Sequence, residues 1–304
     1  MDFISYNMLK LSAAGLVLVL VTSDSSTRFN GYYSYAAGAS NRVGAAGYAG
    51  SQGAARPAPG YRSTLSPTYT PSQINWAGRA WRVNAGATWA PNMVRSLQIS
   101  PSGRKVRFEI RNTNQDNSKN DGEWVRRSEL SGSIYGDPTR LPNGVALWGA
   151  FSTKHHSWAD PAGMAKRMGG VYGQIHFGAG GSPAMAFRRT RSGELRITTR
   201  GDNDRSGTVR YQAPLSFDRV HDIVYRIVLD PDAGQLTVWI DGARVVNVSR
   251  VSIGNYRARS YWNQGLYFAG GVSAPVVAEY ANTIYPSRVS LAGRVARRPA
   301  WPTD

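Results

Sequence analysis

Three short stretches of this chain place polar side chains two residues apart, the spacing that puts them on one face of a β-strand. The first carries Arg127 and Glu129, and the second carries Gln174 and His176. The third, residues 261–267, carries polar or aromatic groups at its first, third and seventh positions. Because hydrogen-bonding and titratable groups share a face in each stretch, the three together suggest an active site.

Arginine, glutamine, histidine and tyrosine form a working set for β-elimination from a uronic acid. The C5 proton of such a sugar lies next to a carboxylate, so its removal builds charge on a group that is already anionic. Arg127 can neutralise that carboxylate through a charge-assisted contact. Gln174 can donate a further hydrogen bond where the charge grows, a role worth about 10²–10³ in rate in other enzymes.

The same reaction needs a base and an acid. An imidazole titrates near neutral pH, which suits His176 to taking the C5 proton. Tyr267 can protonate the departing C4 oxygen, and as a phenolate it could also serve as the base. A phenol has a reference pKa of about 10, so the second role needs a nearby positive charge, for which Arg127 is a plausible source.

Each stretch alone also has a plain structural interpretation. An arginine–glutamate pair on a strand is usually a surface ion pair of little energetic value. A single histidine is more often a satisfied structural residue, and tyrosines on a sheet usually pack against it. The combination of all three stretches favours the catalytic interpretation.

The elements that must hold these residues are strands. Val106, Phe108 and Ile110 alternate with charged residues, which is the pattern of a half-buried strand. Asp241-Gly242 supplies a tight turn that predicts a hairpin. Further strands are predicted at 145–152, 184–190, 194–200, 222–230, 235–240 and 275–285. We therefore predict an all-β fold, an antiparallel β-sandwich of the jelly-roll, concanavalin A-like type.

The chain divides into four segments. Residues 1–23 hold a short apolar run that fits a signal peptide, with an uncleaved anchor as the alternative. Residues 24–71 are rich in Gly, Ala and Ser and predict a flexible, disordered linker. Residues 72–288 form the predicted jelly-roll domain, followed by a C-terminal tail at 289–304. The leader predicts a secreted or periplasmic protein, without stable membrane insertion once the leader is cleaved.

The charge balance points to an anionic partner. The formal net charge is +17, and a field of that sign favours polyanions. The chain lacks a recognisable nucleic-acid-binding motif, so we expect an acidic polysaccharide rather than nucleic acid. Arg188 is a candidate residue for binding such a polysaccharide. An equal alternative is that it is a solvent-exposed residue at the end of a strand. Cysteine is absent from the sequence, which excludes disulfides and thiolate metal sites.

Taken in order, the three stretches resemble the motifs of the jelly-roll polysaccharide lyases. The matching runs are Arg127-Ser128-Glu129-Leu130, Gln174-Ile175-His176 and Tyr261-x-x-x-Gly265-x-Tyr267. The pattern is most similar to that of alginate lyases, with glucuronan and heparin-type lyases as relatives of similar fold. The resemblance spans about residues 72–288.

The resemblance implies a role for each residue. Arg127 and Gln174 would neutralise the carboxylate, and His176 and Tyr267 would act as base and acid, with Tyr267 filling both roles in a syn elimination. Glu129 would orient Arg127 or contact sugar. Tyr261 and Asn263 would line the subsites.

The sequence departs from the alginate-lyase pattern at three positions. Ser131 stands where a basic residue usually ends the first motif, and Asn263 stands where the third motif usually has lysine. Trp262 replaces the usual phenylalanine. The lost positive charge weighs against alginate as the substrate and weighs less on the type of reaction.

Two other groups of residues could bind ligands. His155 and His156 are adjacent, so in a strand they point to opposite faces and are poorly placed to share a metal ion. We expect neither a metal nor another cofactor. Trp148, Trp158, Trp239 and Trp262 could stack on sugars, although Trp239 lies in an apolar strand and is predicted to be core. Gly265 removes bulk between Tyr261 and Tyr267 and could admit a sugar ring.

Two other functions stay open. One is a carbohydrate-binding module that keeps the groove but does not turn over its ligand. The other is a glycoside hydrolase, which needs two carboxylates about 5–5.5 Å or 6.5–9.5 Å apart. Glu123 and Glu129 share strand parity, but the sequence has no dense acidic motif. The sequence leaves the oligomeric state open.

Overall fold

The computed structural model describes residues 60–63, 73–85, 96–111, 116–120, 123–133, 140–157, 170–177, 182–201, 204, 206–255, 260–269, 272 and 274–304. All of them belong to one compact unit, residues 52–304. The predicted leader, Trp158 and most of the predicted linker lie outside the described residues. No helix within these ranges has the length and apolar character needed to cross a lipid bilayer.

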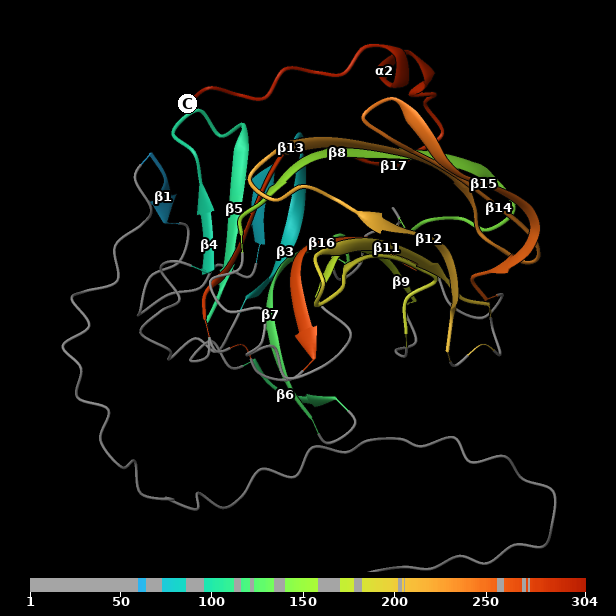
Figure 1. Cartoon of the computed structure of the whole chain (residues 1–304), viewed down its shortest axis with the longest axis horizontal. Coiled ribbons are helices and arrows are strands. Elements are labelled where there is room, and N and C mark those ends of the chain that lie inside the picture. Colours follow the sequence, from blue (N-terminus) through green and yellow to red (C-terminus); the bar gives the residue numbers. More distant parts are fainter. Residues whose placement is uncertain are drawn as a thin grey trace, which may run out of the picture. The chain divides into compact units, whose positions relative to one another are not determined.

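The described strands form two antiparallel sheets that pack face to face (Figure 1). One has eight strands in the order β1 (Arg62–Ser63), β4 (Leu97–Ile99), β5 (Lys105–Ile110), β17 (Val276–Ser287), β8 (Ala146–His155), β13 (Val220–Val228), β14 (Asp230–Ile240) and β15 (Ala243–Ile253). This architecture confirms the predicted all-β sandwich of the jelly-roll type.

The second sheet has nine strands. Its order is β12 (Thr208–Pro214), β11 (Glu194–Thr199), β10 (Met185–Arg189), β9 (Val171–Phe177), β16 (Ser260–Ala269), β7 (Glu123–Ser131), β3 (Arg79–Ala85) and β2 (Gln73–Trp76). The ninth, β6 (Asp116–Asn120), pairs with β7 outside this path.

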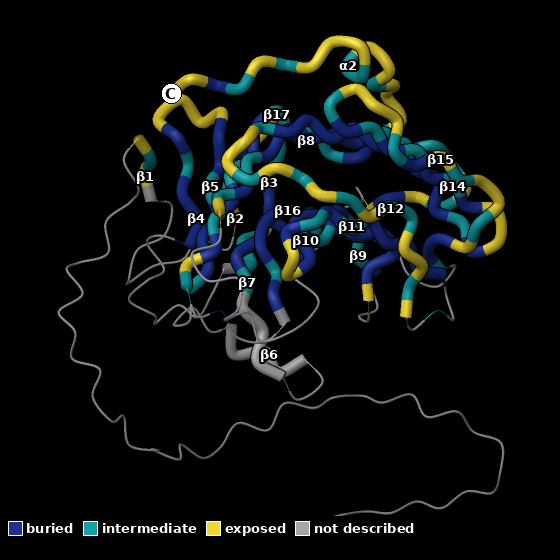
Figure 2. The backbone as a smooth tube through the Cα atoms, in the orientation of Figure 1, coloured by how far each residue is buried: buried dark blue, intermediate teal, exposed yellow. Residues whose placement is uncertain are grey.

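Apolar residues at alternating positions of the strands are buried between the sheets, and Figure 2 shows in dark blue where buried residues lie along the backbone. Val106, Phe108 and Ile110 of β5 are fully buried, as their alternation predicts. Phe151 from β8 packs against Trp262 from β16 with ring centroids 5.6 Å apart. This contact joins the two sheets and holds the inner face of β16 against the core. The opposite face of β16 therefore points outward.

The turn after β14 also follows the prediction. Asp241 and Gly242 both have positive φ, 53° and 86°, which suits a two-residue hairpin turn between right-twisted strands. β14 and β15 pair antiparallel on either side of it.

Two tryptophans differ from their predicted environments. Trp262 is 1% exposed, so it belongs to the core and cannot stack on a sugar. Trp239, predicted to be core, is only partly buried. Its strand neighbours Val238 and Ile240 point inward, and the alternation of the strand therefore turns Trp239 outward.

The two adjacent histidines point in opposite directions, as expected in a strand. His155 faces the core, where its Nδ1 accepts a hydrogen bond from Arg189 Nε at 2.9 Å. His156 lies outward, and its Nε2 is 2.7 Å from a carboxylate oxygen of Glu279. No group of three metal-ligating side chains gathers among the described residues.

Residues 289–304, here called the C-terminal belt, cross the outward face of the eight-stranded sheet (Figure 1). The belt contains α2 (Ala292–Ala296). Arg298 Nη1 lies 2.9 Å from Asp241 Oδ1. Asp304, at the end of the belt, lies 3.8 Å from Lys105 Nζ in β5.

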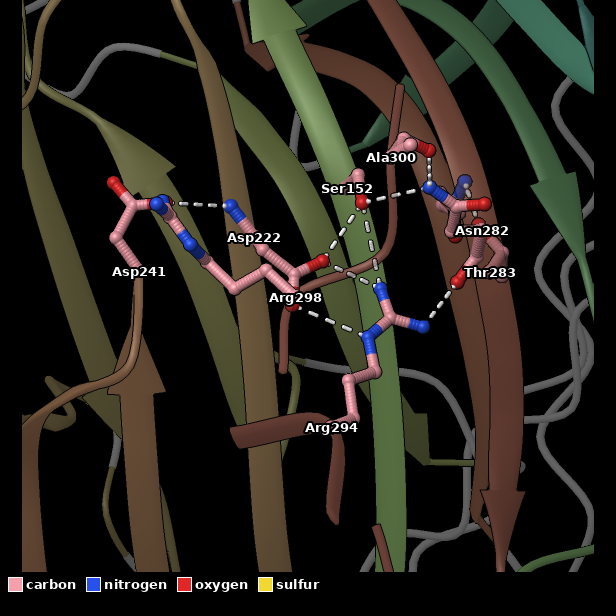
Figure 3. Close-up of polar contacts among 9 residues, drawn as sticks. Ser152, Asp222, Asp241, Asn282, Thr283, Arg294, Arg298 and Ala300 are labelled. Atoms are coloured by element: carbon pink, nitrogen blue, oxygen red, sulfur yellow. Dashed lines mark hydrogen bonds and ion pairs between the residues drawn. The ribbon is translucent and has the colours of Figure 1, made fainter. Parts of the chain in front are cut away.

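The strongest belt contact is an ion pair between Arg294 and Asp222 (Figure 3). The guanidinium donates through Nη2 to Asp222 Oδ1 at 2.6 Å and through Nε to Asp222 Oδ2 at 3.2 Å. Ser152 donates to the same carboxylate at 2.7 Å. A bidentate pair with an added hydroxyl donor satisfies the buried carboxylate and fastens α2 to the sheet.

Candidate active site

The three stretches singled out in the sequence lie on three neighbouring strands. β7, β16 and β9 are consecutive in the nine-stranded sheet. Tyr267 on β16 is paired with Arg127 on β7. On the other side of β16, Asn263 is paired with Gln174 and Tyr261 with His176. We call these residues, together with Glu129, the candidate patch.

The candidate patch lies on the face of the sheet that points away from the core. On β7, Ser128 and Leu130 are fully buried. Ile175 on β9 and Leu266 on β16 are buried in the same core. Since successive residues of a strand point to opposite faces, the residues between them face outward.

Glu129 is the centre of the patch. Its side chain is 1% exposed. Gln174 Nε2 donates a hydrogen bond to Glu129 Oε1 at 2.8 Å, and Arg127 Nε lies 3.3 Å from Glu129 Oε2. The carboxylate therefore holds the two donors that the sequence assigned to the substrate, which fits an orienting role for Glu129 toward Arg127.

Arg127 also contacts Tyr267. The guanidinium carbon lies 4.8 Å from the centroid of the Tyr267 ring, within the range of a cation–π interaction. Arg127 keeps 25% of its side chain exposed. The patch thus presents a cation, oriented from below by Glu129, beside a phenol.

His176 and Tyr261 form the other end of the patch. Their rings stack with centroids 5.5 Å apart, and the Tyr261 hydroxyl lies 3.2 Å from His176 Nδ1. His176 Nδ1 is also 2.7 Å from the carbonyl oxygen of Phe177. A carbonyl can only accept, so Nδ1 carries the proton and Nε2 is the nitrogen able to take one.

The phenol of Tyr261 is held in its neutral form. Burial raises its pKa, the nearby Glu129 carboxylate raises it further, and Arg127, Arg82 and Arg140 oppose both effects. Tyr261 therefore serves as a hydrogen-bonding and stacking group rather than as a base.

Asn263 lies between the two ends of the patch. It is 5% exposed, and its Oδ1 is buried without a hydrogen-bond partner among the described residues. A buried amide oxygen in that state has unused acceptor capacity.

Gly265 has a different function from the one predicted. Its φ is 136°, and a Cβ built there would lie 2.3 Å from the carbonyl oxygen of Ser128. The pairing of β16 with β9 shifts between Gln264 and Tyr267. The glycine therefore permits a local backbone irregularity that sets the position of Tyr267, and it does not leave space for a sugar.

Arg188 lies on the same face as the patch. Tyr267 is paired with Val171 on β9, Val171 with Arg188 on β10, and Arg188 with Arg196 on β11. Burial, together with the nearby cations Arg200 and Arg196, lowers the pKa of Arg188 to about 10. Arg188 thus stays cationic at neutral pH.

We call Arg127, Arg188 and Arg196 the arginine row, because they follow one register across the sheet. At a strand spacing of about 4.8 Å, Arg188 lies about 14 Å from Arg127 and Arg196 about 19 Å from it. Arg196 was not among the site residues predicted from the sequence. Its signal was the alternation of buried Leu195 and Ile197, which turns Arg196 outward.

Comparisons with known proteins find the fold but no sequence family. No family model matches the chain, and no curated protein sequence does. Among solved structures, the chain resembles the family 7 alginate lyase A1-II′ in complex with its product, with a TM-score of 0.50 and 13% identity over 67% of this chain and 94% of that one.

Two further structures are similar at lower scores. An endo-β-1,4-glucuronan lyase from Trichoderma reesei has a TM-score of 0.45 and 13% identity over 75% of this chain and 94% of that one. The catalytic domain of a glycoside hydrolase family 131 protein from Coprinopsis cinerea has a TM-score of 0.47 and 18% identity over 72% and 88%. At such identities, the likeness to the alginate lyase shows the fold alone, which is an antiparallel jelly-roll sandwich.

Proposed function

We propose that this chain is a polysaccharide lyase that cleaves a uronic-acid-containing polysaccharide by β-elimination. The observation that carries the proposal is the register of β7, β16 and β9, which brings Arg127, Gln174, His176 and Tyr267 to one outward face.

The first requirement of the reaction is neutralisation of the uronate carboxylate. Arg127 is held by Glu129 and keeps 25% of its side chain exposed, so its guanidinium can meet the carboxylate of a ligand. Gln174 keeps a second amide N–H beyond the one given to Glu129. The two donors together would stabilise the charge that develops as C5 is deprotonated.

The second requirement is proton transfer. The C5–H electrons form the C4–C5 double bond, the C4–O bond breaks, and the departing oxygen gains a proton. Tyr267 and His176 are candidates for both transfers. His176 is paired with Tyr261, which lies six residues from Tyr267 on β16. In a regular strand this spacing separates His176 from Tyr267 by about 20 Å.

That separation favours one residue for both transfers. Tyr267 contacts Arg127, the group that would hold the carboxylate, so it is the closer of the two to C5. We therefore propose that Tyr267, as a phenolate, takes the C5 proton and then, as the phenol so formed, gives it to the leaving oxygen on the same face of the sugar. His176 would then bind the neighbouring sugar together with Tyr261.

The substrate would be a polyuronate that lies across the strands. The arginine row supports this orientation, because its cations follow the direction perpendicular to the strands. A strand spacing of about 4.8 Å is close to the length of one sugar in an extended chain, so several carboxylates of one polymer could meet the row. Glucuronan and alginate are both candidates.

A retaining or inverting hydrolase is less well supported. Glu123 and Glu129 lie six residues apart on β7, about 20 Å along the strand, against at most about 9.5 Å for an inverting pair. A binding module without turnover remains the second candidate function, because Arg127 and Gln174 are both engaged by Glu129.

We further propose that the protein is exported, on the basis of the apolar run within residues 1–23. Export to the periplasm or beyond would bring the enzyme to a polymer that cannot enter the cell. N-terminal sequencing of the protein recovered from its native host would test this, with a start after residue 20 expected and an intact leader contradicting it.

The test of the proposed function is a panel of polyuronates read by ultraviolet absorbance, which reports the new C4–C5 double bond. Alginate, glucuronan, hyaluronan and heparin would be compared. We expect absorbance to rise with at least one polymer, and Tyr267→Phe to abolish the rise while polymer binding persists. Binding without absorbance on every polymer would support the binding module instead.

A further inference from the structure

A second aromatic feature lies on the opposite side of the sandwich from the candidate patch. Trp148 on β8 and Trp239 on β14 stack with ring centroids 5.5 Å apart and planes inclined by 9°. Both are partly exposed. Their neighbours Leu147 and Val238 are buried in the core, so the two indoles stand on the outward face of the eight-stranded sheet, on either side of β13.

An arginine lies directly across from each indole. Arg226 on β13 is paired with Trp148, and Arg244 on β15 is paired with Trp239. Directly opposed residues of an antiparallel pair have Cβ atoms about 4.5–5.5 Å apart. We call these four residues the outer platform.

The two arginines of the outer platform are not ion-paired with carboxylates of the described residues. Arg226 donates to the amide oxygen of Gln235 at 2.9 Å, and neither Arg226 nor Arg244 forms an ion pair with a described residue. The acidic side chains at the belt end of this face, Asp222 and Asp241, are paired with Arg294 and Arg298. The platform therefore keeps its positive charge.

We propose that the outer platform is a second binding site for an anionic polysaccharide, separate from the candidate patch. The flat C–H face of a pyranose packs on an indole, as other apolar groups do on aromatic rings. A uronate carboxylate next to that sugar suits a guanidinium beside the ring. The ligand class rests on the proposed function, since both sites would hold the same polymer.

Two sites on opposite sheets would act together on a long chain. Binding at one site raises the effective concentration of the polymer at the other, so the platform would strengthen capture of polymer and leave short oligosaccharides unaffected. The C-terminal belt contacts the same sheet at Asp222 and Asp241. These contacts hold the part of the sheet that adjoins the outer platform.

The experiment is affinity electrophoresis in gels that contain alginate or glucuronan. It would use full-length protein carrying Arg127→Ala and Tyr267→Phe, which removes cleavage and the main cation of the patch. We expect Trp148→Ala/Trp239→Ala in that background to weaken binding of the retarding polymer about tenfold. Arg226→Gln/Arg244→Gln, which leaves both indoles in place, should weaken it by a similar factor.

Thermal melting would verify that each variant is folded. Arg297→Ala, an exposed charge change in the belt, is the matched control and should retain the parent mobility. Unchanged retardation in both platform variants would overturn the proposal, as would stronger retardation by a neutral β-1,4-glucan. A platform-dependent dimer with unchanged retardation would also overturn it and assign the face to self-association.

The result is separable from the proposed function. If wild-type protein gave no unsaturated product on any polymer, the proposed lyase activity would fail, while platform-dependent retardation would still be measured. If the platform variants kept full retardation while the wild type released unsaturated product, only the platform would fail.

Discussion

Each sheet carries an acid–arginine pair on its outward face, and the two pairs differ in what remains exposed. In the nine-stranded sheet, Glu129 is 1% exposed and its partner Arg127 is 25% exposed. In the eight-stranded sheet, Asp222 is 5% exposed and Arg294 only 10%. Arg294 is also bonded to the carbonyl oxygen of Asn282 at 2.5 Å.

The difference separates a structural pair from a pair that can serve a ligand. The Arg294 guanidinium donates its hydrogen bonds to Asp222 and to the Asn282 carbonyl oxygen. Its role is therefore to fasten the C-terminal belt to the sheet. Arg127 is oriented by a buried carboxylate and still reaches solvent beside Tyr267. A partly exposed arginine that lies beside a tyrosine and is oriented by a buried acid is therefore what distinguishes the candidate patch from the Arg294 pair.

The largest expected effect comes from breaking the structural pair. Arg294→Ala leaves Asp222 hidden without its cation, and removing one member of a buried pair costs about 3–5 kcal/mol. We expect the free energy of unfolding in urea to fall by that amount, with activity per folded molecule unchanged. Arg297→Ala, on the exposed side of the same segment, should change it by less than about 0.5 kcal/mol.

Breaking the other pair should affect catalysis instead. Arg127→Ala is expected to lower kcat/KM on the responsive polymer by about 10²–10³, the loss typical of one preorganised donor. Steady-state absorbance kinetics would measure it. Arg127→Lys keeps the charge without the bidentate fork and should recover part of the rate. If Arg127→Ala lost as much stability as Arg294→Ala and kept normal kinetics, the Arg127–Glu129 pair would also have only a structural role.

The smallest effect concerns two histidines, one buried and one in the patch. Burial lowers the pKa of His155 well below its usual value, and the nearby Arg189 cation lowers it further. The unfolded chain therefore binds a proton there below about pH 6.5 while the folded chain does not. Stability is fully present above that pH and is lost as the pH falls, by at most about 1.4 kcal/mol per pH unit.

His155→Gln should flatten that loss between about pH 6.5 and 5, measured by urea unfolding at several pH values. His176→Gln is the matched control and should leave the slope of stability with pH as in the wild type. An equal slope in wild type and His155→Gln would show that another group governs the acid sensitivity.

Much of the fold followed from the sequence because strand alternation is a local signal. The alternation of Val106, Phe108 and Ile110 predicted β5, and Asp241-Gly242 predicted the hairpin that β14 and β15 form. The prediction for Trp239 was wrong because an apolar run does not by itself show which of its residues face inward. Val238 and Ile240 take the inward positions, which leaves Trp239 outward.

The candidate site was predictable in its residues and not in its arrangement. Spacing placed Gln174 and His176 on one face, but which strands are neighbours depends on non-local pairing that a single sequence does not encode visibly. The shift in pairing before Tyr267 depends on the backbone conformation of Gly265. The belt carries no periodic pattern, so its contact through Arg294 had no local signal either.

The most direct test of the account is digestion of the responsive polyuronate in heavy-oxygen water, followed by mass spectrometry of the products. β-Elimination breaks the C4–O bond without adding water. We predict products one water lighter than hydrolysis fragments, without incorporated heavy oxygen, and their loss in Tyr267→Phe. One heavy oxygen per cleaved bond would contradict the account.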